Sequence, residues 1–212
     1  MRGLFWPKLA AHILSLLPFA WLVWDTAGDA LGADPIAAIT HRSGDWALRF
    51  VLIALAVTPL RRLSGWNVLA RFRRLLGLYA FFYASLHFAT YLILDLGGYW
   101  TQILDDLVKR PYITVGFLAW LCLLPLALTS TQGMMRRLGR RWAQLHRLAY
   151  VVGVLGVLHY LWLVKADLRE PMWYGALLTL LLLLRLPSLA RRLERRRKPR
   201  PLRRPPEPEF PG

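Results

Sequence analysis

Five histidines are the residues of this chain most able to do chemistry, and three of them lie on just two long apolar segments. His87 lies within segment 75–94, while His146 and His159 lie at the start and near the end of segment 146–164. Ionisable side chains at membrane depth are rare and usually functional. Neutral imidazole is a common metal ligand and holds haem iron axially. These three histidines are therefore the candidate metal-binding and cofactor-binding residues.

The spacing predicts that His87 and His159 lie at a similar depth. His87 is about 18 Å from the inner end of its segment and His159 about 20 Å, at about 1.5 Å per helical residue. Both segments run from inside to outside, so the two imidazoles could hold one iron from opposite sides. His146 lies about 140° from His159 on an ideal helix. Either these two serve different cofactors or the helix is distorted.

Small residues accompany the histidines on both segments and would leave room for a flat macrocycle. They also let membrane helices approach closely, and that alternative stays open. Zinc is a rival metal, but it prefers four ligands, and neither segment carries a carboxylate at mid-depth. His12 and His41 are weaker candidates. The small residues are Gly77, Ala80, Ala84, Ala149, Gly153 and Gly156.

The elements that must position these histidines are membrane helices. The chain has 212 residues, is 56% hydrophobic and has a mean hydropathy of +0.36. Backbone groups in lipid must pair within their own segment, and no barrel-like alternation is present. We therefore expect an all-α integral membrane protein, a bundle of about six transmembrane helices. The expected spans are 9–24, 46–60, 75–94, 112–129, 146–164 and 173–186.

The net charge of +16 is divided unevenly between alternate connecting segments. One set holds 22 of the 28 Lys and Arg residues and only 3 of the 12 acids. This is a positive-inside pattern, which predicts that both termini are cytoplasmic and argues against nucleic acid as the partner. We expect one membrane domain at 1–190, followed by a basic, Pro-rich, disordered cytoplasmic tail at 191–212 that anchors on anionic lipid.

Other features narrow the function classes. A single cysteine, Cys122, excludes a disulfide framework and a four-thiolate iron–sulfur cluster. The first apolar segment is expected to be a retained helix rather than a cleaved signal peptide. No internal repeat is evident. Arg49 is a candidate partner for a haem propionate or, alternatively, an arginine that extends to the membrane interface.

Several short motifs together resemble the MsrQ family, the haem-binding membrane subunits of methionine sulfoxide reductase systems within the ferric-reductase-like transmembrane superfamily. The resemblance covers about residues 9–185. The motifs are RRLLG (73–77) leading to LH (86–87), RPY (110–112), TSTQ (129–132), GRRW (139–142) leading to LH (145–146), and HYLW (159–162).

This resemblance implies one or two b-type haems, bound by His87, His146 and His159, and an associated FMN. It implies a bacterial inner-membrane protein that takes electrons from a cytoplasmic flavin reductase or from quinol. The acceptor would be MsrP, a periplasmic molybdopterin enzyme that reduces methionine sulfoxide in oxidised proteins. Related oxidases carry a histidine fourteen residues before the one that matches His87, but this chain has Arg73 there, so a second haem is in doubt.

Three hypotheses about function are compatible with the sequence. The first is an electron-transfer subunit without a substrate site of its own, because no nucleophile with its base and no nicotinamide-binding domain is present. The second is a cytochrome b of another quinol-linked, ferric or cupric reductase pathway. The third is a haem-free membrane transporter or scaffold, in which the histidines are polar contacts between helices.

Overall fold

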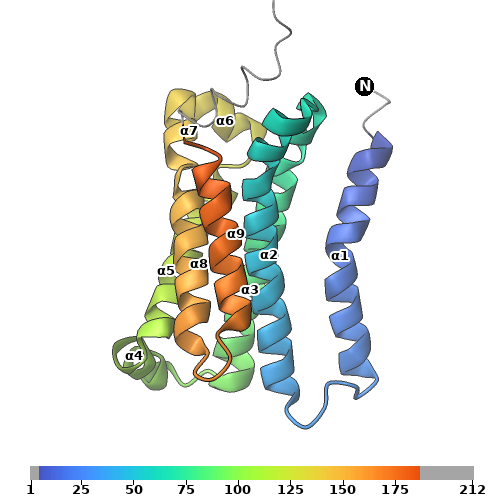
Figure 1. Ribbon diagram of the computed structural model, residues 1–212. Coiled ribbons are helices and arrows are strands. Elements are labelled where there is room, and N and C mark those ends of the chain that lie inside the picture. Colours follow the sequence, from blue (N-terminus) through green and yellow to red (C-terminus); the bar gives the residue numbers. More distant parts are fainter. Residues whose placement is uncertain (1–4, 187–212) are drawn as a thin grey trace, which may run out of the picture.

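The computed structural model describes residues 5–186, and this part of the chain is built from helices without strands (Figure 1). The basic tail expected at 191–212 lies outside the described residues. The elements are α1 (Phe5–Ala27), α2 (Pro35–Ser64), η2 (Asn67–Arg71), α3 (Arg73–Thr90) with its π-helical continuation η3 (Tyr91–Asp95), α4 (Trp100–Lys109), α5 (Pro111–Leu128), α6 (Gln132–Leu138), α7 (Arg140–Leu145), α8 (Leu148–Leu163) and α9 (Arg169–Leu183).

The long helices stand side by side in one bundle. The two most extensive pairings are α2 with α3 and α5 with α8, and α9 packs on α8 and α2. Helix α1 stands at the side of the bundle and contacts α2 and α3. Figure 1 shows α4 at one end and α6 and α7 at the other, where α1 begins and α9 ends. The first and last described helical ends are therefore at the same end of the molecule.

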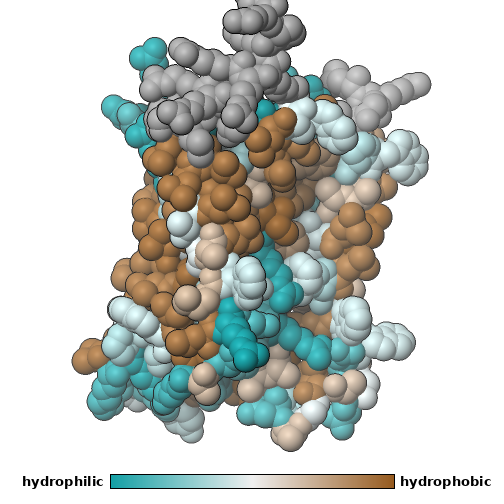
Figure 2. Space-filling view, viewed as in Figure 1, coloured by the Kyte–Doolittle hydropathy of each residue, from teal (hydrophilic) through white to brown (hydrophobic). Residues whose placement is uncertain are grey.

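Five helical segments are long and apolar enough to cross a membrane. They are α1, α2, α3 with η3, α5, and the segment Arg140–Leu163 that contains α8. Figure 2 shows apolar side chains over the middle of the visible face and hydrophilic ones gathered toward the α4 end. The expected sixth span corresponds to α9, which has 15 residues and spans about 22 Å, less than a full hydrocarbon core. The six-span count and the cytoplasmic termini stay predictions.

Helix α2 begins eleven residues earlier than the expected start at position 46. The cause is local: the Asp34 carboxylate accepts a hydrogen bond from the Ala37 N–H, and Pro35 occupies the first turn, where its missing N–H costs nothing. Gly65, with a φ of 79°, ends the helix in the left-handed conformation. The segment that includes His41 is therefore helical and belongs to the bundle, not to a loop.

The fifth expected span is interrupted at the histidine that was expected to begin it. Helix α7 ends at Leu145, His146 caps it, and α8 begins at Leu148. The helix that was expected to carry both His146 and His159 is therefore distorted at its start. That the two histidines serve different cofactors stays a prediction. The 10-residue α4, within a segment expected to be a loop, is a further difference.

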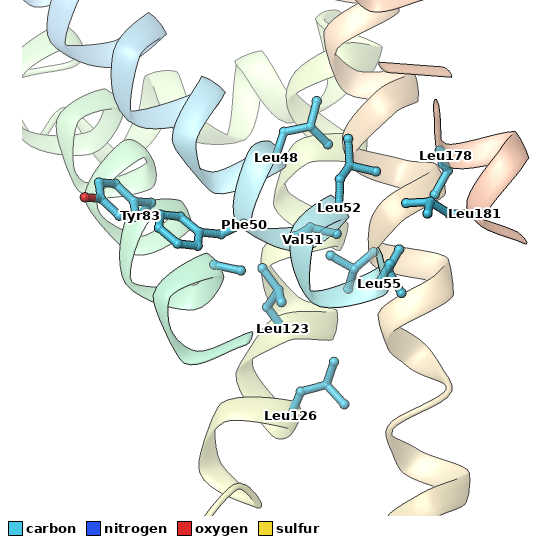
Figure 3. Packing of buried hydrophobic residues seen from close by; sticks show 12 residues of the cluster. Leu48, Phe50, Val51, Leu52, Leu55, Tyr83, Leu123, Leu126, Leu178 and Leu181 are labelled. Atoms are coloured by element: carbon cyan, nitrogen blue, oxygen red, sulfur yellow. The ribbon is translucent and has the colours of Figure 1, made fainter. Parts of the chain in front are cut away.

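A cluster of buried apolar side chains ties α2 to its neighbours (Figure 3). Dense packing matters here because lipid tails are as apolar as the side chains, so close contact rather than water exclusion favours helix association. Tyr83 is 1% exposed and stacks on Phe50, with ring centroids 5.3 Å apart. Around them lie Leu48, Val51, Leu52 and Leu55 of α2, Leu123 and Leu126 of α5, and Leu178 and Leu181 of α9.

One polar contact is made inside this packing because α2 contains a proline. Pro59 has no N–H, so the carbonyl of Leu55, four residues earlier, lacks its helical partner. The Arg185 guanidinium donates to that carbonyl and also to the hydroxyl of Tyr150 on α8. It further lies over the Tyr150 ring, 4.9 Å from its centroid. Arg185 thus joins α2, α8 and the end of α9.

We predict that Arg185→Met lowers the free energy of unfolding by about 1–3 kcal/mol, because it leaves the Leu55 carbonyl unpaired. Pro59→Ala restores an N–H beside that carbonyl, so the loss from Arg185→Met should be smaller in the Pro59→Ala background. Thermal unfolding in detergent measures the loss of stability in both backgrounds. The control is Arg74→Met, which changes an exposed arginine of α3. If the losses from the two substitutions are strictly additive, the Leu55 carbonyl does not need the Arg185 side chain as its partner.

Candidate functional site

The structure brings His87 of α3 and His159 of α8 together. Their ring centroids are 6.0 Å apart and their ring planes are inclined by 79°. The two residues lie 72 positions apart in the chain (87 to 159), on helices that both pack on α2. The depth matching argued from the sequence therefore corresponds to a close pair, and their role as metal ligands stays a prediction.

Each ring is fixed by a hydrogen bond through its Nδ1 atom. His87 Nδ1 is 2.9 Å from the backbone carbonyl oxygen of Thr40 on α2, and His159 Nδ1 is 2.6 Å from that of Tyr112 on α5. A carbonyl accepts and cannot donate, so each Nδ1 carries the hydrogen. Each Nε2 then has the free lone pair that a metal requires.

A glycine lets each ring reach its carbonyl. A Cβ on Gly44 of α2 would lie 3.0 Å from His87 Nδ1, and one on Gly116 of α5 would lie 2.6 Å from His159 Nδ1. Each glycine comes four residues after the carbonyl that the histidine contacts. In an α-helix its side chain would stand beside that carbonyl on the same face. The missing side chains therefore open the helix surface to the imidazoles.

These contacts reveal an internal repeat that the sequence did not make evident. In both helix pairs the histidine comes 47 residues after the residue whose carbonyl it contacts. The carbonyl, the glycine and the histidine of the second pair each follow their counterparts by 72 residues (40 to 112, 44 to 116, 87 to 159). The pairs α2–α3 and α5–α8 are thus two copies of one arrangement, and each supplies one imidazole to the centre.

A cavity of about 320 Å³ contains both histidines. Ligand pockets begin at about this size. Its inner walls are apolar, with Val51 of α2, Leu123 of α5 and Val152 of α8. Of the small residues noted in the sequence, Ala84 and Gly156 line it. Gly153 instead packs on side chains of Leu55 and Leu178, as close helix contact requires.

The geometry fits a metal held between the two imidazoles. About 2 Å for each metal–nitrogen bond, plus about 1 Å from nitrogen to ring centre on each side, gives about 6 Å between centroids. The observed separation is 6.0 Å. Within residues 5–186 no group of three or more His, Cys, Asp or Glu side chains could hold a metal ion. Two axial nitrogens in an apolar cavity suit haem iron, whose remaining ligands come from the porphyrin.

His146 lies elsewhere, at the end where α6 and α7 are found. Its ring stacks on Trp142 at 3.8 Å between centroids, and its Nδ1 contacts the Trp142 carbonyl at 3.0 Å. The carbonyl of Leu126 also acts on the ring. His146 is not part of the cavity lining, so the structure separates it from the other two histidines. Its ligand role stays a prediction.

The structure also shows the surroundings of His12, His41 and Arg49. His12 contacts the Tyr79 hydroxyl through Nδ1 at 2.8 Å, whereas His41 lines the cavity. Arg49 donates to the Tyr174 hydroxyl at 2.9 Å and lies 3.6 Å from Asp45. Arg49 is not among the residues that line the cavity, and both alternatives for it, propionate partner or interface arginine, stay predictions.

The cation at the cavity mouth is Arg110, in the turn between α4 and α5. Asp106 of α4 accepts a hydrogen bond from the Tyr91 hydroxyl at 2.8 Å and lies 3.3 Å from Arg110. The Asp106 carboxylate raises the pKa of Arg110, which keeps the guanidinium charged. Ile103 and Leu107 of α4 also line the cavity, so α4 covers its outer opening. Asp106 is buried, and its contacts with Tyr91 and Arg110 hold α4 in place.

Comparison with known proteins matches residues 43–157 to the model of the ferric reductase like transmembrane component. The MsrQ heme-binding subunit of protein-methionine-sulfoxide reductase from Xanthomonas oryzae pv. oryzae (strain MAFF 311018) is 60% identical over 181 residues, covering 82% of this chain and 83% of that protein. The subunit of the same description from Herminiimonas arsenicoxydans is 54% identical, over 84% of this chain and 83% of its own length.

The chain belongs to the MsrQ family. This confirms the resemblance seen in the motifs and, together with the five apolar helices, makes it a multi-pass membrane protein of the ferric-reductase-like class. The matched residues 43–157 include Gly44, His87, Tyr112 and Gly116. The match begins three residues after Thr40 and ends two residues before His159.

The sequence found the two facing histidines but missed Thr40, Gly44, Tyr112 and Gly116, which orient them. Glycine and a main-chain carbonyl carry no chemical signal of their own. The signal that could have found them is the constant offset of 72 residues between the two Gly–His sets.

We predict that Gly116→Ala strongly reduces the b-type haem absorbance of the purified protein. The new methyl group would lie less than 3 Å from the His159 ring, whose position is held by its hydrogen bond to the Tyr112 carbonyl. Gly77→Ala on α3 is the matched control, because a Cβ there meets nothing within 4 Å. Equal absorbance in the two variants would contradict this account of Gly116.

Proposed function

We propose that this chain is a haem b electron-transfer subunit of a bacterial inner membrane. It passes electrons from a cytoplasmic flavin reductase or from quinol to a periplasmic MsrP-like molybdopterin reductase that repairs methionine sulfoxide in oxidised proteins. The observation that carries the proposal is the pair His87 and His159, both held through Nδ1 with Nε2 free at an apolar cavity. The names of the relatives, heme-binding subunits of protein-methionine-sulfoxide reductases, support it.

When bound, haem supplies a one-electron ferric–ferrous couple. The chain's own residues determine its setting. The Thr40 and Tyr112 carbonyls fix the imidazole tautomers and increase the basicity of the ligating nitrogens. The apolar walls keep water from the iron, and α4 covers the outer opening. Nothing in this arrangement activates a substrate, so the chain works as an electron carrier for its partner.

The positions of the histidines support a direction of transfer. The pair lies in the half of the bundle nearer α4, the end at which the acidic connecting segments meet. His146 and its stacked Trp142 lie toward the basic end. By the positive-inside rule the basic end faces the cytoplasm. Electrons would therefore enter near His146, where FMN is also proposed to associate, and leave toward the periplasm.

We predict that His87→Ala and His159→Ala each remove most of the b-type absorbance from protein that still inserts into the membrane. Each change deletes one of the two imidazole nitrogens that would hold the haem iron. His12→Ala, which alters a histidine outside the cavity lining, is the control. Haem quantification on purified protein measures the effect. Full absorbance in both site variants would exclude this pair as the ligands.

We predict that His146→Ala keeps most of the haem held by His87 and His159 but slows its reduction by a cytoplasmic donor. His146 lies outside the cavity lining and at the basic end, where electrons are proposed to enter. Stopped-flow reduction by a flavin reductase with its reduced pyridine nucleotide gives the rate. An unchanged rate would leave His146 a structural residue that caps α7 and stacks on Trp142.

Coupling to the acceptor tests the proposed function as a whole. Haem reduced with dithionite, after the excess is removed, should be reoxidised rapidly when both an MsrP-like reductase and methionine sulfoxide are present, and slowly with either one alone. Rapid reoxidation by ferric citrate or cupric ions instead would favour a metal-reductase pathway. If freshly purified protein has no haem spectrum, the hypothesis of a haem-free membrane transporter or scaffold is favoured.

A further inference from the structure

The ionisable side chains that join His87 and His159 in lining the cavity gather at the α4 end of the bundle. They come from the beginning of α2, the end of η3 and the turn before α5, which Figure 1 shows near α4. The inner walls, by contrast, are apolar. Within residues 5–186, Arg110 is the single Lys or Arg among the lining residues. The other ionisable groups of the lining, tyrosines apart, are His41, Asp45 and Asp95.

A haem group in this cavity must place two carboxylates as well as its iron. Haem b carries two propionates on one edge of an otherwise apolar macrocycle. An ionised carboxylate is strongly disfavoured in apolar surroundings unless a cation or hydrogen-bond donor pairs with it. The apolar inner walls offer no such partner. We therefore expect the propionate edge to face the α4 end, where charged side chains line the cavity.

Arg110 is held in a position to bind a second carboxylate. Its Nε lies 3.3 Å from Oδ1 of Asp106, and Oδ2 of Asp106 accepts a hydrogen bond from the Tyr91 hydroxyl. A guanidinium has five N–H donors, so a contact through Nε leaves the terminal nitrogens able to donate elsewhere. Arg110 also directly precedes α5, two residues before Tyr112, whose carbonyl orients His159. The same turn of the chain therefore carries the cation and fixes one imidazole.

The two ion pairs at the mouth of the cavity are oriented oppositely. In the pair of Arg110 with Asp106, the cation lines the cavity and the carboxylate does not. In the pair of Arg49 with Asp45, the carboxylate lines the cavity and the cation does not. A propionate is therefore attracted near Arg110 and repelled near Asp45. The charges thus favour the side of the mouth formed by α4 and α5 over the side formed by α2.

We propose that Arg110 binds a propionate of the haem held between His87 and His159, and that the propionate edge is directed toward α4 and α5. The guanidinium then bridges the propionate and Asp106, so that binding of haem also fastens α4 over the cavity. This inference rests on the proposed haem function. It adds a residue that binds the group and determines which way round the group lies.

Iron protoporphyrin IX and its dimethyl ester, in which both propionates are uncharged, test this assignment. Full-length protein is purified from haem-deficient cells and titrated with each porphyrin, and the b-type spectrum gives the dissociation constant. Loss of one charge-assisted contact should weaken haem binding about tenfold in Arg110→Gln. Binding of the ester should be the same in Arg110→Gln and wild type, because the ester has no carboxylate for the guanidinium to pair with.

Lys109→Gln is the matched control. Lys109 is the neighbouring cation, pairs with Asp105 four residues earlier as Arg110 pairs with Asp106, and is outside the cavity lining. This variant should bind both porphyrins as the wild type does. Asp106→Asn removes the ion pair but keeps the cation. An effect that arises only from loosening α4 would therefore appear in Asp106→Asn, and it would be equal for haem and ester.

The outcomes separate this proposal from the proposed function. An Arg110→Gln protein that takes up the ester but no haem supports the proposal. Equal weakening of both porphyrins in Arg110→Gln, or weakening of neither, overturns it. A loss confined to haem that appears in Arg49→Gln or His41→Gln, but not in Arg110→Gln, also overturns it. Wild type that forms no b-type spectrum with either porphyrin would instead refute the haem function itself.

Discussion

Two hydrogen bonds from imidazole Nδ1 atoms to helix carbonyls set the geometry of the whole centre. A helix carbonyl already accepts the N–H four residues later, but its second lone pair stays available. In both helix pairs the residue four positions later is a glycine, so the ring approaches without meeting a side chain. The bonds therefore fix the tautomer, the ring direction and the distance between helices. The two Nε2 atoms, the cavity and the 6.0 Å separation of the rings follow from them.

The membrane makes these constraints strict. The hydrocarbon core holds no water that could hydrogen-bond a polar group, so each carbonyl oxygen or imidazole nitrogen must be paired within the protein. The chain achieves this pairing in two ways. Histidines use carbonyls opened by glycines, and Arg185 uses the Leu55 carbonyl released by Pro59. Both devices connect helices that are distant in sequence, so the same contacts that satisfy polar groups also hold the bundle together.

The two ends of the bundle differ in the charged residues that they carry. At the α4 end Arg42, Arg49, Lys109 and Arg110 each form an ion pair with a carboxylate, and Asp106 also accepts a hydrogen bond from Tyr91. Toward the other end the described residues include several arginines and no Asp or Glu. One polypeptide can thus present different surfaces to partners on opposite sides of a membrane. The apolar cavity of His87 and His159 lies between these surfaces.

The sequence by itself determined the helical membrane class, the approximate positions of the apolar helices and the pairing of His87 with His159. Hydropathy, charge and the depth of a residue along a helix are local properties of short segments, so they can be derived without knowing the tertiary contacts. Only the tertiary structure decided that α2 begins at Pro35, that the helix breaks at His146, and that Arg110 rather than Arg49 lines the cavity. It also decided which glycines matter. Gly44 and Gly116 look like Gly77 in the sequence, and they differ because only they face an imidazole on another helix.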